Sequence, residues 1–284
     1  MFVAAAGARS VTAQTAVVDV PMIMRGPMPA VEVMVNGKGP FLFAIDTGAS
    51  GQARADSSLV AKLSLPDAGE VRGTDGSGSA GTQMKVVILD SVKIGGLEVR
   101  SVSAPSRNYN LSPNLPKIDG ILGFGFFADH LLTLDYAGKR VKITQGKLPA
   151  ANGKDILDFK AARGGAPSLD LTIGGTKVMA HIDTGNTVGQ FVLPSATAEK
   201  LTFIGEPVVK GRARTVTSEI EIKEVKIKEM IKLGQFEFPQ PLITFPGVSH
   251  DVNMGSRALA DLSVTFDQKN KRLRLSGRKT GKSQ

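Results

Sequence analysis

The stretch FAIDTG at residues 43–48 closes a run of alternating apolar residues, and AHIDTG at residues 180–185 closes a second run in the other half of the chain. The preceding residues also agree, because PAVEVMVNG at 29–37 matches PSLDLTIGG at 167–175. Alternation predicts half-buried strands, and Asp-Thr-Gly predicts a turn where each strand ends. The chain therefore contains an internal duplication that supplies one carboxylate from each half.

The two carboxylates, Asp46 and Asp183, are candidates for shared acid–base chemistry. Two carboxyl groups held about 3 Å apart in a cleft of low dielectric cannot both ionise, so the pair holds one proton. Such a pair contains a base that can take a proton from water and an acid that can polarise a carbonyl, which allows amide hydrolysis without a covalent intermediate. Glycine after Asp-Thr permits unusual backbone angles and close approach of a substrate. We expect the Thr hydroxyls to bond across the axis between the halves and hold the two loops in register.

Each triplet is followed later in the chain by an apolar segment that ends in glycine, DGILG at 119–123 and VNMG at 252–255, where Asn253 interrupts the apolar pattern. Similar endings follow at 126–135 and 256–267, and each indicates a short helix, a strand ending in Asp, a turn and a basic strand. With these motifs the chain resembles, over residues 17–277, the pepsin and retropepsin superfamily of aspartic proteases. The nearest match is a single-chain, two-lobed, bacterial retropepsin-like member.

The resemblance implies an all-β fold with two similar barrel-like lobes and an active-site cleft between them. It divides the chain into a leader or disordered start (1–16), an N-terminal lobe (17–150), a C-terminal lobe (151–277) and a basic tail (278–284). It implies that Asp46 and Asp183 are catalytic and that no dimer is needed, so we expect a monomer. The implied substrate-binding residues of the triplets are Thr47, Gly48, Thr184 and Gly185. Local signals predict four short helices, over residues 56–65, 125–132, 194–203 and 256–262.

A glycine-rich segment, residues 69–81, lies between the first triplet and DGILG. In the family this position holds the flap, a hairpin that closes over bound peptide, and glycine hinges suit a mobile lid. A pepsin-type flap carries Tyr, which this segment lacks, so the retropepsin type is nearer, as it is for Ala49 after the triplet. Fewer hydroxyls near the dyad predict a mildly acidic to neutral pH optimum. The predicted substrate-binding residues of the flap tip are Asp75, Gly76, Ser77 and Gly78.

The second half contains an analogous stretch at residues 208–219, which is either a second flap or a solvated loop. The alternation that follows slips at Lys223 and Glu224, which predicts a β-bulge there. Asn186 stands where the family commonly has a small or hydroxyl residue after the second triplet. The hydrogen bonding around Asp183 is therefore open.

Composition limits the other functions. The 284 residues carry 35 Lys and Arg against 26 Asp and Glu, a net charge of +9, with no Cys. The lack of Cys excludes thiol catalysis, disulfides and thiolate metal sites, and three scattered His predict no metal site. With no Trp and two Tyr there is no aromatic platform for bases, so we expect no nucleic acid partner. The partners we expect are a peptide or protein substrate and, through the basic charge, a weak attraction to membrane surfaces; we expect no cofactor.

The first residues, MFVAAAGA, are small enough for a signal-peptidase site but lack a basic start and a full apolar core. A trimmed export signal predicts a periplasmic or secreted protein; a disordered start without targeting meaning predicts a cytoplasmic one.

Four alternatives stand beside the endopeptidase. Asn186, Asn253 and the missing flap Tyr motivate a catalytically inactive peptide-binding or sensor module, and a protease that cuts one partner only would look inert toward generic peptides. A duplicated β protein whose carboxylates merely cap turns leaves the paired motifs unexplained. The glycine pattern at 123–128 fits a dinucleotide fingerprint, but no βαβ unit follows it.

Overall fold

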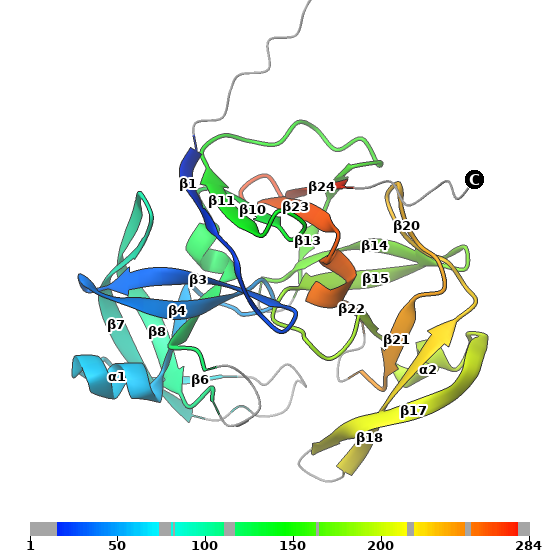
Figure 1. Ribbon diagram of the computed structural model, residues 1–284, viewed down its shortest axis with the longest axis horizontal. Helices are drawn as coiled ribbons and strands as arrows, with labels where there is room; N and C mark the ends of the chain where they lie inside the picture. Colours follow the sequence, from blue (N-terminus) through cyan, green and yellow to red (C-terminus); the bar gives the residue numbers. More distant parts are fainter. Residues whose placement is uncertain are drawn as a thin grey trace, which may run out of the picture.

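A computed structural model describes residues 16–73, 81, 83–110, 117–162, 165–214, 219–247 and 251–277. These residues form three β-sheets and two short α-helices, which confirms the predicted all-β, two-lobed fold (Figure 1). Several predicted features lie outside the described residues: the leader, the flap tip with Asp75, Gly76, Ser77 and Gly78, and the basic tail. Within the described residues, no helix has the length and apolar character needed to cross a membrane.

The first lobe is an eight-stranded sheet in the order β2-β3-β4-β9-β5-β8-β7-β6. Its strand β4 carries the first triplet, and β9 is inserted between β4 and β5, parallel to the one and antiparallel to the other. The strands are β2 Ile23–Arg25, β3 Met28–Val35, β4 Lys38–Asp46, β5 Ala53–Asp56, β6 Glu70–Arg72, β7 Gln83–Ile94, β8 Leu97–Arg107 and β9 Gly120–Gly123.

The second lobe repeats this arrangement in a ten-stranded sheet in the order β17-β18-β21-β16-β22-β15-β14-β19-β20, with β13 paired to β14. Strand β15 carries the second triplet, and β22 lies between β15 and β16 with the same parallel and antiparallel pairings. The strands are β13 Lys160–Ala161, β14 Pro167–Ile173, β15 Thr176–Asp183, β16 Phe191–Val192, β17 Phe203–Arg214, β18 Glu219–Ile227, β19 Ile231–Leu233, β20 Phe236–Phe238, β21 Leu242–Phe245 and β22 Val252–Gly255.

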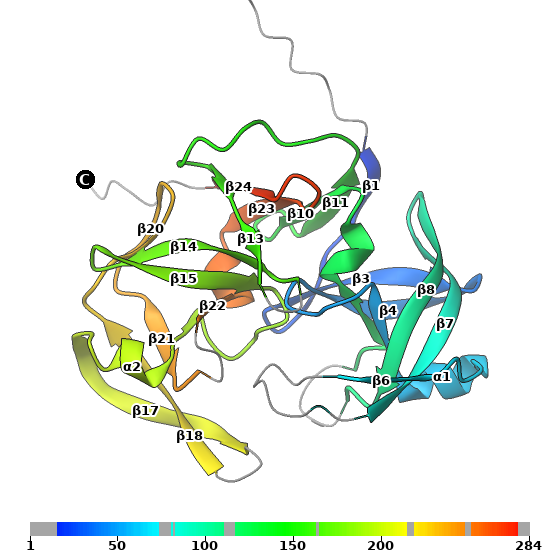
Figure 2. The ribbon, with the colours of Figure 1, turned by 180° about the vertical axis from the view of Figure 1, so that it is seen from behind.

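A six-stranded sheet joins the two halves, and it lies between the lobes in both views (Figures 1 and 2). Its central pair is β10 with β23, the two repeated endings, which run antiparallel with Thr133 opposite Thr265. The two hydroxyls of this pair are 2.8 Å apart. The order is β1-β11-β10-β23-β24-β12, with β1 Ala16–Pro21, β10 Leu131–Asp135, β11 Arg140–Thr144, β12 Ile156–Asp158, β23 Leu262–Asp267 and β24 Arg272–Gly277.

The helices are shorter than the sequence predicted. Helix α1 (Ser57–Leu63) starts at an Asp56 cap and helix α2 (Ser195–Ala198) is a single turn. The helices predicted over 125–132 and 256–262 are wrong in type, because each is one 3-10 turn, η1 (Phe124–Phe127) and η2 (Ser256–Leu259). Alternating apolar residues follow each turn and pair in the six-stranded sheet, so the strand replaces the rest of the helix.

The predicted β-bulge lies on the other strand of its hairpin. Val209 pairs with Lys223 and Gly211 with Ile222, so Lys210 is the extra residue and β17, rather than β18, carries the irregularity. In the exposed part of this hairpin, Arg212 lies 3.5 Å from Glu221 in an ion pair across the strands. The described part of the second candidate flap is therefore a long hairpin on which the side chains of Lys210 and Arg212 are exposed.

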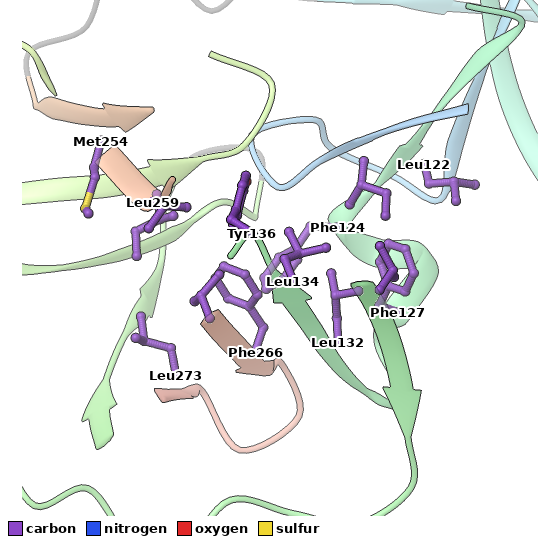
Figure 3. Close-up of a cluster of buried hydrophobic side chains, with 14 of the residues drawn as sticks. Leu122, Phe124, Phe127, Leu132, Leu134, Tyr136, Met254, Leu259, Phe266 and Leu273 are labelled. Atoms are coloured by element: carbon purple, nitrogen blue, oxygen red, sulfur yellow. The ribbon is translucent and has the colours of Figure 1, made fainter. Parts of the chain in front are cut away.

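A single apolar core contains side chains from both lobes. Figure 3 shows Leu122 and Phe124 from the first lobe, Leu134 from β10, and Phe266 and Leu259 from the second half in one continuous cluster. Phe124 packs edge-to-face on Phe266, with ring centroids 5.4 Å apart. Because each of these side chains is almost fully buried, each contributes about 1.5–3 kcal/mol of hydrophobic stabilisation. The core therefore joins the two lobes, and it adjoins the first aspartate loop because Leu122 pairs with Ile45, the residue before Asp46.

Candidate active site

The two aspartates end strands β4 and β15 and meet where the lobes join. A Cβ placed on Gly48 would lie 2.6 Å from Cγ of Asp183, and one on Gly185 would clash with the carboxyl of Asp46. The Asp46 and Asp183 side chains share a hydrogen bond. Neither glycine has a positive φ, so the expectation of unusual backbone angles is wrong. Glycine is required here because any side chain would occupy the space of the opposite carboxyl.

Thr47 and Thr184 hold the two loops together as a reciprocal pair. The Thr47 hydroxyl donates to the Ile182 carbonyl at 2.8 Å and accepts from Thr184 N–H at 3.1 Å. The Thr184 hydroxyl donates to the Ile45 carbonyl at 2.7 Å and accepts from Thr47 N–H at 3.0 Å. Both threonines are buried. They position the loops rather than face a substrate.

Each aspartate accepts two backbone N–H groups on one oxygen. Oδ1 of Asp46 accepts from Gly48 at 2.8 Å and Ala49 at 3.0 Å. Oδ1 of Asp183 accepts from Gly185 at 3.0 Å and Asn186 at 3.1 Å. The backbone therefore treats the two carboxyls alike, and any difference between them must come from side chains.

One side chain makes that difference. The Asn253 amide donates to Oδ2 of Asp183 at 2.8 Å, and the Asn186 amide donates to the Asn253 carbonyl oxygen at 2.7 Å. Asn253 pairs with His181 on β15, whereas its first-lobe counterpart Ile121 pairs with Ala44 on β4. The two asparagines that depart from the family pattern thus form one chain of hydrogen bonds to Asp183. Sequence reasoning noticed both positions but missed their connection, which depends on strands far apart in the chain.

The electrostatics follow the same asymmetry. Burial raises the pKa of Asp46 to about 7, with Asp183 as the next cause, while the Gly48 N–H and the positive charge of Arg54 act in the opposite direction. A hydrogen bond to the charged form of a carboxyl favours ionisation, and Asp183 has one such donor more than Asp46. Burial also lowers the pKa of His181, against the pull of Asp183 and Asp251, which favours a neutral imidazole beside the site.

A second support reaches the Asp183 loop from the six-stranded sheet. The Ser256 hydroxyl donates to the Thr184 carbonyl at 2.7 Å, and the Tyr136 hydroxyl lies 2.9 Å from Ser256 Oγ. Burial raises the pKa of Tyr136, so the phenol stays protonated and can donate. No sequence pattern predicted this role for either residue, because Tyr136 and Ser256 are 120 positions apart.

The arrangement offers no metal chemistry among the residues described. No group of three or more His, Cys, Asp or Glu side chains in this part of the chain could hold a metal ion. The site consists of two interacting carboxyl groups with backbone and side-chain amide donors around them.

The comparison with known families agrees with this geometry. The sequence model of the aspartyl protease family matches residues 31–126 and 169–258, one match for each lobe. The chain belongs to the aspartyl protease family. A search of curated proteins for similar sequences found no match.

Proposed function

We propose that the protein is an aspartic endopeptidase that hydrolyses peptide bonds with a water activated between Asp46 and Asp183. The observation that carries the proposal is the paired geometry: two carboxyls hydrogen-bonded to each other at the lobe junction, with the pKa of one raised to about 7. Such a pair holds one proton over a wide pH range, which supplies an acid and a base together.

The hydrogen bonds support a different role for each aspartate in this proposal. Asp183 accepts from two backbone N–H groups and from the Asn253 amide, so it is the ionised member and the general base. Asp46 accepts from two backbone N–H groups only on Oδ1, so it keeps the proton and is the general acid.

The reaction then balances within the pair. Asp183 takes a proton from water as the water oxygen bonds to the carbonyl carbon, and Asp46 gives its proton to the carbonyl oxygen. In the second step Asp183 gives its proton to the amide nitrogen, the C–N bond breaks, and Asp46 regains a proton as the carbonyl reforms. The products are a carboxylic acid and an amine, and the dyad ends with one proton, as it began.

The substrate in this proposal is an extended peptide segment that crosses the junction between the lobes, with Asp75, Gly76, Ser77 and Gly78 as the proposed contacts from the flap. Gly48 and Gly185 face the opposite carboxyl without a side chain, which leaves room for the two carboxyls to approach each other, and both aspartates are partly exposed. The protein acts as a single chain, since both halves of the site come from one sequence.

The test is digestion of a peptide library by the wild type, Asp46→Asn and Asp183→Asn, with pepstatin as an inhibitor control. We expect wild-type cleavage and a loss on the order of 10²–10⁴-fold in each variant, with far-ultraviolet circular dichroism unchanged. Cleavage that survives both substitutions would contradict the proposal. Saturable peptide binding without products at any pH would instead support the inactive binding module, for which Asn186 and Asn253 were the original motive.

A further inference from the structure

A half-buried arginine lies on the wall of the first aspartate loop. Ala44 on β4 pairs with Ile121 on β9, and Ile121 pairs with Arg54 on β5, so the three side chains lie in a row on one face of the sheet. Alternation along β4 puts Asp46 on this face too, two residues after Ala44. The positive charge of Arg54 acts on Asp46, in agreement with this placement on the sheet.

Arg54 lacks a hydrogen-bond partner for a buried atom. Its Nε is shielded from solvent and has no partner among the described residues. Two acids in this part of the sheet, Asp56 at the end of β5 and Asp119 just before β9, already accept other hydrogen bonds. Asp56 accepts from Ser58 and from Tyr109 N–H, and Asp119 accepts from Leu42 N–H. A buried, unpaired donor is costly, and each such group requires an explanation.

A second unpaired polar atom lies on the same wall. The Tyr109 ring packs against the small cluster that contains Ala44 and Ile121, and its hydroxyl is buried with no partner among the described residues. The guanidinium of Arg107 covers the other part of the ring, 4.8 Å from its centroid. The wall therefore combines two unused donors with a second positive charge, which suits an anionic group.

We propose that Arg54 binds an acidic side chain of the substrate beside the bond to be cleaved, with the Tyr109 hydroxyl as an additional donor. The inference rests on the proposed peptidase function and names its substrate class: peptides with Glu or Asp next to the cleavage site. Arginine is suited to this role because its planar fork binds carboxylate with two parallel hydrogen bonds. The position matching Arg54 in the second lobe is Val192, opposite Asn253, so the preference acts on one side of the cleft only.

The test compares peptides that differ at one position, within three residues of the cleaved bond, in carrying Glu, Gln or Lys. The enzymes are the wild type, Arg54→Gln, Arg54→Glu and Arg54→Val, the last copying the second lobe. Arg100→Gln is the matched control, because Arg100 is an exposed β8 arginine paired with Glu98 at 2.9 Å. We expect kcat/KM of the wild type and of the control to favour Glu over Gln by about tenfold or more at one position. Arg54→Gln and Arg54→Val should abolish that ratio, and Arg54→Glu should favour Lys.

Two results overturn the inference. The first is a ratio of kcat/KM for Glu over Gln peptides that Arg54→Gln leaves unchanged. The second is a shift of the pH–rate profile in Arg54→Gln that is equal for all peptides, which would show that Arg54 acts on Asp46 alone. Peptide binding to the Asp183→Asn variant, with and without Arg54→Gln, separates this inference from the proposed function. Glu-selective binding that needs Arg54, without any wild-type cleavage, would retain the acidic site and reject the peptidase. Wild-type cleavage without any preference for Glu in cleavage or in binding would retain the peptidase and reject the acidic site. If neither cleavage nor Glu-selective binding is observed, both the peptidase and the acidic site are rejected.

Discussion

The two aspartate loops share one backbone and differ in the side chains on their walls. In the first lobe the row next to the aspartate is Ala44, Ile121 and Arg54; in the second it is His181, Asn253 and Val192. In the second row the central residue, Asn253, donates to Asp183, while the charged residue of the first row, Arg54, is one strand further out. Duplication gave two carboxyl sites with matching backbone hydrogen bonds. Single side chains gave Asp183 an additional amide donor and placed a positive charge on the wall of the first site.

The symmetric part of this comparison predicts the largest effect on folding. Thr47→Val and Thr184→Val each remove a donor and an acceptor from the buried reciprocal pair. We expect each to lower the free energy of unfolding by about 2–5 kcal/mol, because buried N–H and C=O groups lose their partners. Urea unfolding followed by circular dichroism measures this. Thr133→Val is the control at the less buried pair with Thr265, with an expected cost of about 1 kcal/mol. If one of the two loop variants were tolerated much better than the other, the loops would not be equivalent.

The difference between Asn253 and its first-lobe counterpart Ile121 predicts that Asn253→Ile, which gives the second lobe the residue of the first, lowers kcat. Removing the amide takes away the side-chain hydrogen bond to Asp183, so kcat should fall about tenfold or more. The titratable groups that interact with Asp183 are Asp46, His181 and Tyr136, and they are unchanged in the variant. Ile121→Val is the matched control and should leave kcat unchanged. An equal fall in kcat in the two variants would assign Asn253 a packing role only.

The raised pKa of Asp46 predicts the basic side of the pH profile. The acid must be protonated to donate to the carbonyl oxygen, and its pKa of about 7 means that activity should fall about tenfold per pH unit above pH 7. The same shift acts on folding. Because the folded state binds this proton more tightly than the unfolded chain, whose Asp has a pKa near 3.8, stability should decline as pH rises from about 4 to 7. Asp46→Asn should remove this part of the slope in unfolding measured against pH. A rate maximum at pH 9 would be incompatible with this assignment.

The smallest effect is expected at the support that Tyr136 and Ser256 give to the second loop. Tyr136→Phe removes the hydroxyl that bonds to Ser256 and should lower the free energy of unfolding by about 0.5–1.5 kcal/mol, with cleavage reduced less than in Asn253→Ile. Thermal unfolding and kcat/KM of the purified variant measure both. The control is Tyr109→Phe, which removes a buried hydroxyl that has no partner among the described residues and should not lower stability, because no hydrogen bond is lost. An equal loss in the two variants would show that the hydroxyl of Tyr136 contributes nothing specific.

Local patterns predicted much of the fold and part of the site. The alternating runs before Asp46 and Asp183 became β4 and β15, and the segment after Asp56 became α1. The helices after Gly123 and Gly255 were predicted too long, because pairing in the six-stranded sheet overrode the local helical preference. The bulge was assigned to β18 instead of β17, since a slip in alternation does not say which strand carries the extra residue.

By itself, the sequence determined that two strand-and-turn units end in matched aspartates, because alternation and turn chemistry are local properties of the chain. Tertiary structure alone decided how the two aspartates differ. The amide of Asn253 reaches Asp183 across 70 positions of sequence, and Arg54 acts on Asp46 from the far side of β9, which is inserted between β4 and β5. Both contacts depend on which strands pair and in what register, and hydrogen bonds and charges act over a few ångströms of space rather than along the chain.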